Sequence, residues 1–253
     1  MDKNRMFWLK NMGIKYILTQ SKGPYKTNNN IPIFNKQKTV VSSNRSQPET
    51  NSENNLMLEN IKDLKELENY VINKIDCPLK KFANKCVFSN KEYNYDESNK
   101  QIMLIGEAPG ATEDLEGRPF CGESGKLLDN IFKSINLYRE KELYICNSVF
   151  WRPPSNRRPS KEEIEICRPA LLKHISLVKP KLIILVGNTA NEAIYEKEMN
   201  YKHIRDKFLK YKNEYMEEET FITAIFHPAY LLRQPNKKKE MWEKIIKIKE
   251  FLR

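Results

Sequence analysis

The sequence predicts an α/β protein in which helices cover both faces of a parallel β-sheet. Four short apolar runs recur along the chain, at residues 102–105, 143–145, 182–186 and 221–226. Each run is followed by a loop and, in most cases, by a segment whose apolar residues have helical spacing. Nearly continuous apolar strands that alternate with helices are typical of a parallel sheet buried on both faces.

The N-terminal residues are predicted to lie outside this α/β domain. Apolar residues indicate a short helix within residues 1–20, ahead of the breaker Gly23-Pro24. Residues 21–55 are rich in Asn, Ser, Lys, Thr and Gln, which predicts a flexible polar linker. Apolar residues return at helical spacing from Leu58 to Val71, so the folded domain is expected to span residues 56–253.

Three further helices are predicted over residues 127–135, 164–178 and 241–252, where apolar residues again recur at helical spacing. Pro159 and Ser160 mark the start of the second of these helices. Ser160 and Glu163 also have the spacing of a capping box, which favours a helix start at this point. The order of the strands in the sheet does not follow from this pattern.

Charge and cysteine content narrow the class of protein. The 253 residues carry a formal net charge of +11, which favours a phosphate polymer as partner, although a lysine-rich solvated surface also explains much of it. The five cysteines show no regular pairing, and the sequence has neither a signal peptide nor an apolar run near twenty residues. We therefore expect a soluble, cytoplasmic protein with one core and no disulfides.

One short stretch concentrates the glycines of a chain that has only eight. Because glycine allows a ligand to approach the main chain, this stretch predicts a ligand-binding loop, although such a turn is often only a turn. The GESGK segment is not a phosphate-binding loop, since Phe120 and Leu127 stand where that motif needs glycine and serine or threonine. GEAPG also lacks the spacing of a dinucleotide site. The glycines concerned are Gly106, Gly110, Gly117, Gly122 and Gly125.

Polar residues follow all four predicted strands. Glu107 comes after the first, Asn147 after the second, Gly187-Asn188 after the third and His227 after the fourth. Ligands of open parallel sheets bind beyond the carboxyl ends of the strands. We therefore expect a carboxylate, an amide and an imidazole to meet at one edge of the sheet.

Two segments are candidates for contact with a nucleic acid. RPPSNRRP carries Arg152, Arg157 and Arg158 among three prolines, and a rigid basic loop suits phosphate contact, although an exposed connector fits the composition equally. The segment 229–233 is predicted to be a loop whose apolar residues beside an arginine can wedge into stacked bases, or one that simply returns to the core. Of the other histidines, His174 and His203 are predicted to be structural or surface groups.

Taken together, four segments resemble the uracil-DNA glycosylase superfamily, and specifically its type-4 group. They are GEAPGATEDLEGRPFCGESGKLL, ICNSVFWRPPSNRRP, PKLIILVGNTA and FHPAYLLRQP, and the resemblance runs from about Cys77 to the C-terminus. It implies a three-layer α/β/α sandwich with a central, mainly parallel sheet. It also implies hydrolysis of the N-glycosidic bond of uracil in DNA, the first step of base excision repair. The alternative is a catalytically silent nucleic-acid-binding member.

The same resemblance implies roles for individual residues. As catalytic residues, Glu107 would position and polarise water, and His227 would hydrogen-bond the uracil oxygen as negative charge grows on the base. Gly106, Glu113, Phe120 and Asn147 would bind uracil: the Phe120 ring by stacking, the Asn147 amide by matching uracil but not cytosine, and Glu113 by excluding the thymine methyl group.

The resemblance further implies that the partner is uracil-containing DNA, single- or double-stranded. We expect a monomer, with no membrane involved. The segment from the fourth strand would enter the minor groove and fill the gap left by the extruded base. The implied DNA-binding residues are Arg152, Arg157, Arg158, Leu231, Leu232 and Arg233.

Cysteine positions depart from the type-4 pattern, which usually includes a [4Fe–4S] cluster held by four cysteines. Cys77 and Cys167 match the first and last ligands, but Lys80 and Trp151 stand at the other two positions. Two thiolates cannot hold a cluster that takes four, and Cys86 would sit away from the family's ligand position. We therefore expect no metal, no cofactor for the chemistry, and two residual cysteines.

Overall fold

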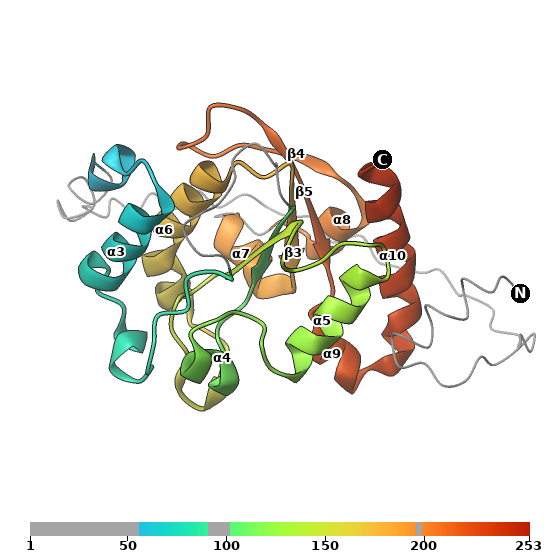
Figure 1. Ribbon diagram of the computed structural model, residues 1–253, viewed down its shortest axis with the longest axis horizontal. Helices are drawn as coiled ribbons and strands as arrows, with labels where there is room; N and C mark the ends of the chain where they lie inside the picture. Colours follow the sequence, from blue (N-terminus) through green and yellow to red (C-terminus); the bar gives the residue numbers. More distant parts are fainter. Residues whose placement is uncertain (1–55, 91–101, 196–198) are drawn as a thin grey trace, which may run out of the picture.

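The computed structural model describes residues 56–90, 102–195 and 199–253 (Figure 1). The helix expected in 1–20 and the linker expected over 21–55 lie outside these residues. The elements in chain order are α3 (Leu64–Lys74), η1 (Pro78–Lys81), β1 (Ile102–Gly106), α4 (Ala111–Glu116), α5 (Glu123–Lys133), β2 (Leu143–Asn147), η2 (Pro154–Asn156), α6 (Lys161–Val178), β3 (Leu182–Val186), α7 (Asn188–Ile194), α8 (Tyr201–Asp206), β4 (Leu209–Tyr211), β5 (Thr220–Ile225), α9 (Pro228–Arg233), η3 (Pro235–Lys237) and α10 (Lys238–Phe251).

The sheet has the strand order β2-β1-β3-β5-β4. The pairs β1–β2, β1–β3 and β3–β5 are parallel, and only β4 runs antiparallel to its neighbour. All four predicted strands are therefore present, and the sheet is mainly parallel as expected. The strand β4 was not predicted, because the charged and exposed Lys210 stands between its other two residues and interrupts the apolar pattern.

Helices cover both faces of this sheet, which confirms the three-layer α/β/α arrangement. Alternate side chains of a strand point to opposite faces. Met103 and Ile105 accordingly share one core with buried residues of α3, α6 and α7, whereas Ile102 and Leu104 share a second core with α5 and α10. Figure 1 shows the first group of helices on one side of the sheet and the second group on the other.

The predicted capping box at the start of α6 is present. The amide of Glu163 donates to Ser160 Oγ over 3.2 Å, and the amide of Ser160 donates to Glu163 Oε2 over 2.7 Å. These bonds satisfy amides that have no partner within the helix, so they define where α6 begins. The helical stretch predicted from Leu58 to Val71 is present in two pieces. Residues 56–60 are helical, and α3 begins at Leu64 after a short break, where Asp63 Oδ1 accepts from the amide of Glu66.

Residues 229–233 are not a loop, as the sequence suggested, but belong to the helix α9. Pro228 occupies the first turn, where its fixed φ favours a helix, and the side chain of His227 caps the helix by accepting from the amide of Ala229. A helix of six residues is too short to show a helical period in its apolar residues. The prediction of a loop was therefore wrong, because the start of this helix is specified by the His227 cap and Pro228 and not by a pattern of apolar residues.

The two histidines predicted to have no catalytic role are placed accordingly. His174 is fully buried on α6, where Nε2 lies 2.7 Å from the hydroxyl of Tyr144 and the ring stacks on Phe88. His203 is exposed on α8. Among the helices of the described residues, none combines the length and the apolar character that crossing a membrane would need.

Candidate active site

A cavity of about 490 Å³ opens at the carboxyl ends of the parallel strands. The carboxylate, amide and imidazole expected to meet at this edge all line it, contributed by Glu107, Asn147 and His227. Asn188 does not join them, because its Nδ2 donates to Glu192 Oε1 beside the neighbouring cavity. Gly187 instead packs against His227, where an added Cβ would lie 3.2 Å from the histidine Cβ.

Phe120 provides the aromatic wall of the cavity. Its ring centroid lies 5.6 Å from that of His227, at an angle of 34° between the planes. Its φ of +52° is in the left-handed region, which costs an L-residue about 1–2 kcal/mol. Gly125 supports this backbone, since a Cβ there would lie 1.9 Å from the Phe120 carbonyl oxygen. The Phe120 ring is therefore held by a main-chain conformation that the surrounding residues impose.

Glu113 forms a second part of the cavity wall and is nearly buried, at 9% exposed. Its carboxylate accepts from three backbone amides, those of Gly110, Cys121 and Gly122, over 2.9 to 3.1 Å. Charge-assisted hydrogen bonds of this kind are short and strong. Glu113 therefore ties the start of α4 to the segment that follows Phe120 and cannot readily leave its place.

Asn147 ends β2 and is 1% exposed. Its Nδ2 has no hydrogen-bond partner among the described residues, although it is buried. A buried amide donor without a partner costs about 1–3 kcal/mol, so such a group at a cavity wall favours a ligand that brings an acceptor. The amide also abuts Gly106, where a Cβ would lie 2.4 Å from Asn147 Oδ1.

The hydrogen bond of His227 decides which ring nitrogen carries the proton. Nδ1 accepts from the Ala229 amide over 3.2 Å, so in the neutral ring the proton is on Nε2. Burial lowers the pKa of His227, and the negative charge of Glu107 opposes this effect. His227 therefore lines the cavity as a neutral imidazole that can donate from Nε2.

We expect the His227 ring to titrate below the ordinary histidine value of about 6.5. Because the pKa of His227 is lower in the folded protein than in the unfolded chain, the neutral ring contributes to the free energy of unfolding above the unfolded pKa. This contribution is lost as the pH falls through the folded pKa. Protonation of Nδ1 would also break the cap of α9. An NMR titration of the ring carbons of His227 checks this. A midpoint for His227 above about 6.5 would contradict it.

Glu107 is held by a residue that the sequence did not single out. Its Oε2 accepts from Thr189 Oγ1 over 2.8 Å. The same threonine hydroxyl oxygen accepts from Arg158 Nε over 3.0 Å. Arg158 also forms an ion pair with Glu192. The hydroxyl of Thr189 therefore fixes one oxygen of the carboxylate. Its position just after the third predicted strand, in the segment VGNTA, was the available signal.

The sequence was also compared with those of known protein families and proteins. The family model described as the uracil DNA glycosylase superfamily matches residues 93–247. This chain belongs to the uracil DNA glycosylase superfamily. It is 39% identical over 153 residues to a type-4 uracil-DNA glycosylase of Sulfurisphaera tokodaii, covering 60% of this chain and 70% of that one. It is also 36% identical over 175 residues to the type-4 enzyme of Archaeoglobus fulgidus, covering 67% and 87%.

In this member of the superfamily, the three arginines of RPPSNRRP are anchored to the protein. Arg157 makes two hydrogen bonds to the Glu163 carboxylate, over 2.9 and 2.6 Å, and lines the cavity. Arg152 donates to Asn156 Oδ1 over 2.7 Å, and Arg158 contacts Thr189 as described above. These contacts give the loop a defined shape beside the cavity. The side chain of Arg157 remains 45% exposed.

The segment 231–233 is divided between the core and the surface. Leu231 is 1% exposed and packs in the second core, whereas Leu232 is 40% exposed. Arg233 lines the cavity, and no acidic partner for it is found in the part of the chain that the structure describes. Leu232 and Arg233 are therefore the residues of this helix that face outward.

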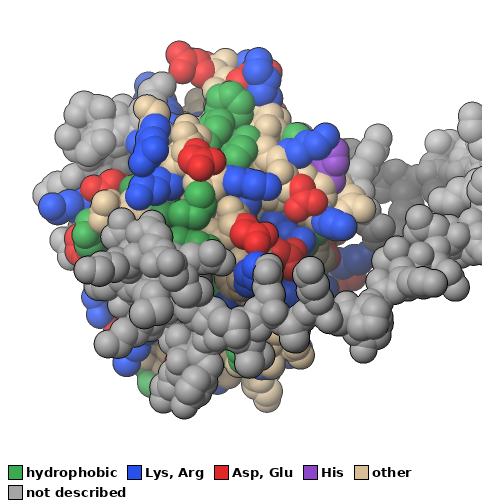
Figure 2. All heavy atoms as spheres, turned by 90° about the vertical axis from the view of Figure 1, so that its right-hand side faces the viewer, with side chains coloured by type: hydrophobic (Ala, Val, Ile, Leu, Met, Phe, Trp, Pro, Cys, Tyr) green, Lys and Arg blue, Asp and Glu red, His purple; other side chains and the backbone are tan. Residues whose placement is uncertain are grey.

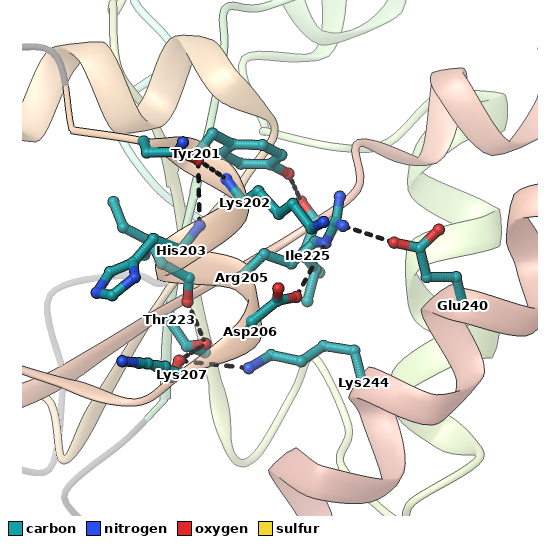
Figure 3. Close-up of polar contacts among 12 residues, drawn as sticks. Tyr201, Lys202, His203, Arg205, Asp206, Lys207, Thr223, Ile225, Glu240 and Lys244 are labelled. Carbon is teal, nitrogen blue, oxygen red and sulfur yellow. Dashed lines mark hydrogen bonds and ion pairs between the residues drawn. The ribbon is translucent and has the colours of Figure 1, made fainter. Parts of the chain in front are cut away.

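Helix α8 braces the strand end that carries His227 (Figure 3). The Tyr201 hydroxyl donates to the carbonyl of Ile225 over 2.5 Å, and Arg205 forms an ion pair with Glu240 of α10. The Arg205 guanidinium also lies 4.2 Å from the ring centroid of Phe226, the residue before His227. These contacts join α8, β5 and α10 at the strand end that leads to His227.

The residual cysteines lie in the first core, away from the cavity. Cys77 and Cys167 are buried there together with Trp151, which is 4% exposed. Lys80 Nζ donates to the carbonyl of Ile72 over 2.7 Å and lies 4.9 Å from the Trp151 ring. The hydrogen bond with Cys77, together with burial, raises the pKa of Cys167 well above its ordinary value. Burial raises the pKa of Cys86 to about 12.

Proposed function

We propose that this chain removes uracil from DNA by hydrolysing the bond between N1 of the base and C1′ of the sugar, leaving an abasic site. The observation that carries this proposal is the convergence of Glu107, Phe120, Asn147 and His227 on one cavity. A protein that only binds DNA has no need for that combination. In the reaction, water adds its oxygen to C1′, and uracil leaves with the electrons of the broken bond and takes up a proton.

Recognition of the base is proposed to rest on Phe120 and Asn147. An enzyme that acts on a base holds it outside the stack, by ring stacking and by hydrogen bonds to its Watson–Crick edge. Uracil presents a carbonyl oxygen and an N3–H there, which match the donor and the acceptor of one amide. Cytosine presents an amino group and a bare N3, which would face the same amide with like groups. The unpartnered Nδ2 of Asn147 supports this assignment.

The chemical step is proposed to depend on His227 and Glu107. Negative charge grows on the uracil oxygens as the bond to C1′ lengthens, and a fixed neutral donor at His227 Nε2 stabilises it. The Glu107 carboxylate orients the attacking water and opposes the positive charge on the sugar. The hydrogen bond from Thr189 supports this role, since it limits the positions that the carboxylate can adopt.

DNA is proposed to lie along the edge that carries the cavity, with Leu232 beside the vacated base position and Arg233 near a phosphate. Figure 2 shows the side of the molecule on which α10 lies, and there the basic side chains of the described residues are interspersed with acidic and apolar ones. The other proposed contacts are the outward donors of Arg152, Arg157 and Arg158. Phosphate contacts release counterions, so binding should weaken as salt is raised.

The direct experiment incubates the purified chain with single- and double-stranded oligonucleotides that contain one uracil, in the presence of EDTA. We expect release of free uracil and an alkali-labile site, and no product from the matched cytosine or thymine strands. Binding of the uracil strand without alkali-labile product would favour the silent-binder alternative.

The Thr189→Val variant is expected to lower the excision rate about tenfold while the protein stays folded. Hydrogen bonds to charged groups contribute about 1.5–3 kcal/mol, and this substitution removes the one from Thr189 to Glu107 at nearly constant volume. The matched control is Thr220→Val, which removes a buried hydroxyl that donates to the carbonyl of Pro180 at the other end of the sheet. Equal losses of rate in both variants, measured in single turnovers, would refute a positioning role for Thr189.

We further propose that the chain works without an iron–sulfur cluster. A cubane cluster takes four thiolates, and the indole of Trp151 and the ammonium of Lys80 cannot replace two of them. The residues present do not fit the group, because the Trp151 indole is buried in the same core as Cys77 and Cys167 and the Lys80 ammonium is hydrogen-bonded to the main chain. No step of the reaction above uses a metal.

Protein purified without oxygen is therefore expected to be colourless, with no stoichiometric iron or acid-labile sulfide. The matched variant carries both Lys80→Cys and Trp151→Cys, which complete the four-cysteine pattern, and is expected to gain broad visible absorption on reconstitution with iron and sulfide. About four irons per chain in the unaltered protein would contradict the proposal and would mean that Cys86 or another group serves as a ligand.

A further inference from the structure

The segment that carries Phe120 is clamped from outside the cavity by one arginine. Arg139 lies in the turn between α5 and β2, and it does not line the proposed uracil site. We propose that Arg139 is a positioning residue, whose guanidinium holds the main chain of Phe120 so that the ring stays over the cavity. This inference rests on the proposed function, because it assigns to the ring the task of stacking on uracil.

Each of the three nitrogen atoms of the Arg139 guanidinium donates a hydrogen bond. Nη1 donates to the carbonyl of Pro119 over 2.8 Å, and Nη2 donates to the carbonyl of Phe120 over 2.6 Å. Nε donates to Asp129 Oδ1 on α5 over 3.0 Å. The side chain of Arg139 is only 18% exposed. The guanidinium therefore joins two consecutive carbonyl groups to a fixed carboxylate.

These contacts act on a backbone that would otherwise relax. Phe120 has a φ of +52°, which a side chain of this size adopts only under constraint. Glu113 holds the amides of Cys121 and Gly122, whereas Arg139 holds the carbonyls of the two preceding residues. The main chain on each side of the Phe120 ring is thus fixed through a charged side chain. Removing the guanidinium leaves the carbonyl side free to rotate towards an extended conformation.

The turn that carries Arg139 is also joined to the strand that carries the base-reading amide. The Arg139 carbonyl accepts from Asn90 Nδ2 over 3.2 Å, and Asn90 Oδ1 accepts from the amide of Ile145 over 2.7 Å. Ile145 lies on β2, two residues before Asn147. Through Asn90 and Arg139, the placement of the Phe120 ring is therefore tied to that of the Asn147 amide.

The test compares Arg139→Gln and Arg139→Lys with the unaltered chain. The glutamine variant is expected to lower the single-turnover rate on saturating uracil-containing DNA about 10- to 100-fold, as small displacements of positioning groups do. It should also raise the concentration of free uracil needed for inhibition by a similar factor, while affinity for undamaged DNA changes less than about twofold. The lysine variant offers a single charged group in place of the planar guanidinium, so its single-turnover rate is expected to lie between those of the glutamine variant and the unaltered chain.

The control is Arg118→Gln, since Arg118 lies on the same segment, is exposed and pairs only with Glu116 among the described residues. It should leave the saturated rate and the uracil inhibition unchanged. A lower melting temperature in Arg139→Gln with unchanged rate and inhibition would overturn the proposal, because a purely structural role predicts that result. If Arg139→Gln does not fold, Asp129→Asn tests the clamp instead, and an unchanged rate there overturns it. Absence of excision in the unaltered chain would refute the proposed function itself.

Discussion

Replacing Gly106 by alanine is expected to lower uracil excision by at least about 100-fold while the domain still folds. A Cβ at this position would lie 2.4 Å from Asn147 Oδ1 and 2.4 Å from Cε2 of Phe120. Neither distance is possible, so the base-reading amide, the stacking ring or both must move. Gly106 ends β1 with an ordinary φ, so the substitution narrows the cavity without imposing backbone strain.

The measurement is the single-turnover rate on a uracil-containing strand, together with a thermal melt. Gly122→Ala is the matched control, since the three atoms nearest to its Cβ would belong to Glu113 and Thr112, at 3.3 Å or more, and not to Phe120 or Asn147. We expect less than about a tenfold loss there. Comparable losses in the two variants would show that the loop tolerates no added methyl group anywhere, and would remove the argument for a uracil site beside Gly106.

His227→Asn is expected to lower the excision rate about 100- to 1000-fold, the usual cost of removing one donor from a site that stabilises negative charge. His227 has two roles in the structure, as the cap of α9 and as a donor on the cavity wall. Asparagine is a favourable capping residue, so α9 should be retained. Its shorter side chain then leaves no donor at the position of Nε2.

Single-turnover rates and circular dichroism of the variant separate these two roles. The exposed histidine of α8 offers the control His203→Asn, which should change neither quantity. A His227→Asn variant that keeps its helix content and most of its rate would show that the imidazole serves only as a cap. The charge on the leaving uracil would then have to be stabilised by another group.

Much of the fold could be predicted because the sheet is buried on both faces. Each of its four parallel strands is a nearly continuous apolar run, and the helices between them carry an apolar stripe. Short elements without such patterns escaped prediction. The three residues of β4 are held by their pairing with β5, and the six residues of α9 depend on the cap formed by His227.

The residue types at the strand ends were determined by the sequence alone. Glu107, Asn147 and His227 each follow an apolar run, and parallel strands necessarily end at one edge, so their convergence could be inferred without coordinates. The same reasoning did not single out Thr189, although it follows the third strand closely, and it could not find Arg139, which lies away from the strand ends. Thr189 contacts a carboxylate 82 residues away, and Arg139 contacts a carbonyl 19 residues away.

Only the tertiary structure decided which of the predicted surface groups are free to meet DNA. The arginines of the basic loop are paired with acceptors from α6, from α7 or from the loop itself. Leu231 is buried while its neighbour Leu232 is exposed. Sequence spacing specifies the period of an element and the chemistry of its ends. How the layers pack decides which distant residues a side chain pairs with and which side of a short helix faces the core. The contacts that fix both form only when distant segments of the chain meet.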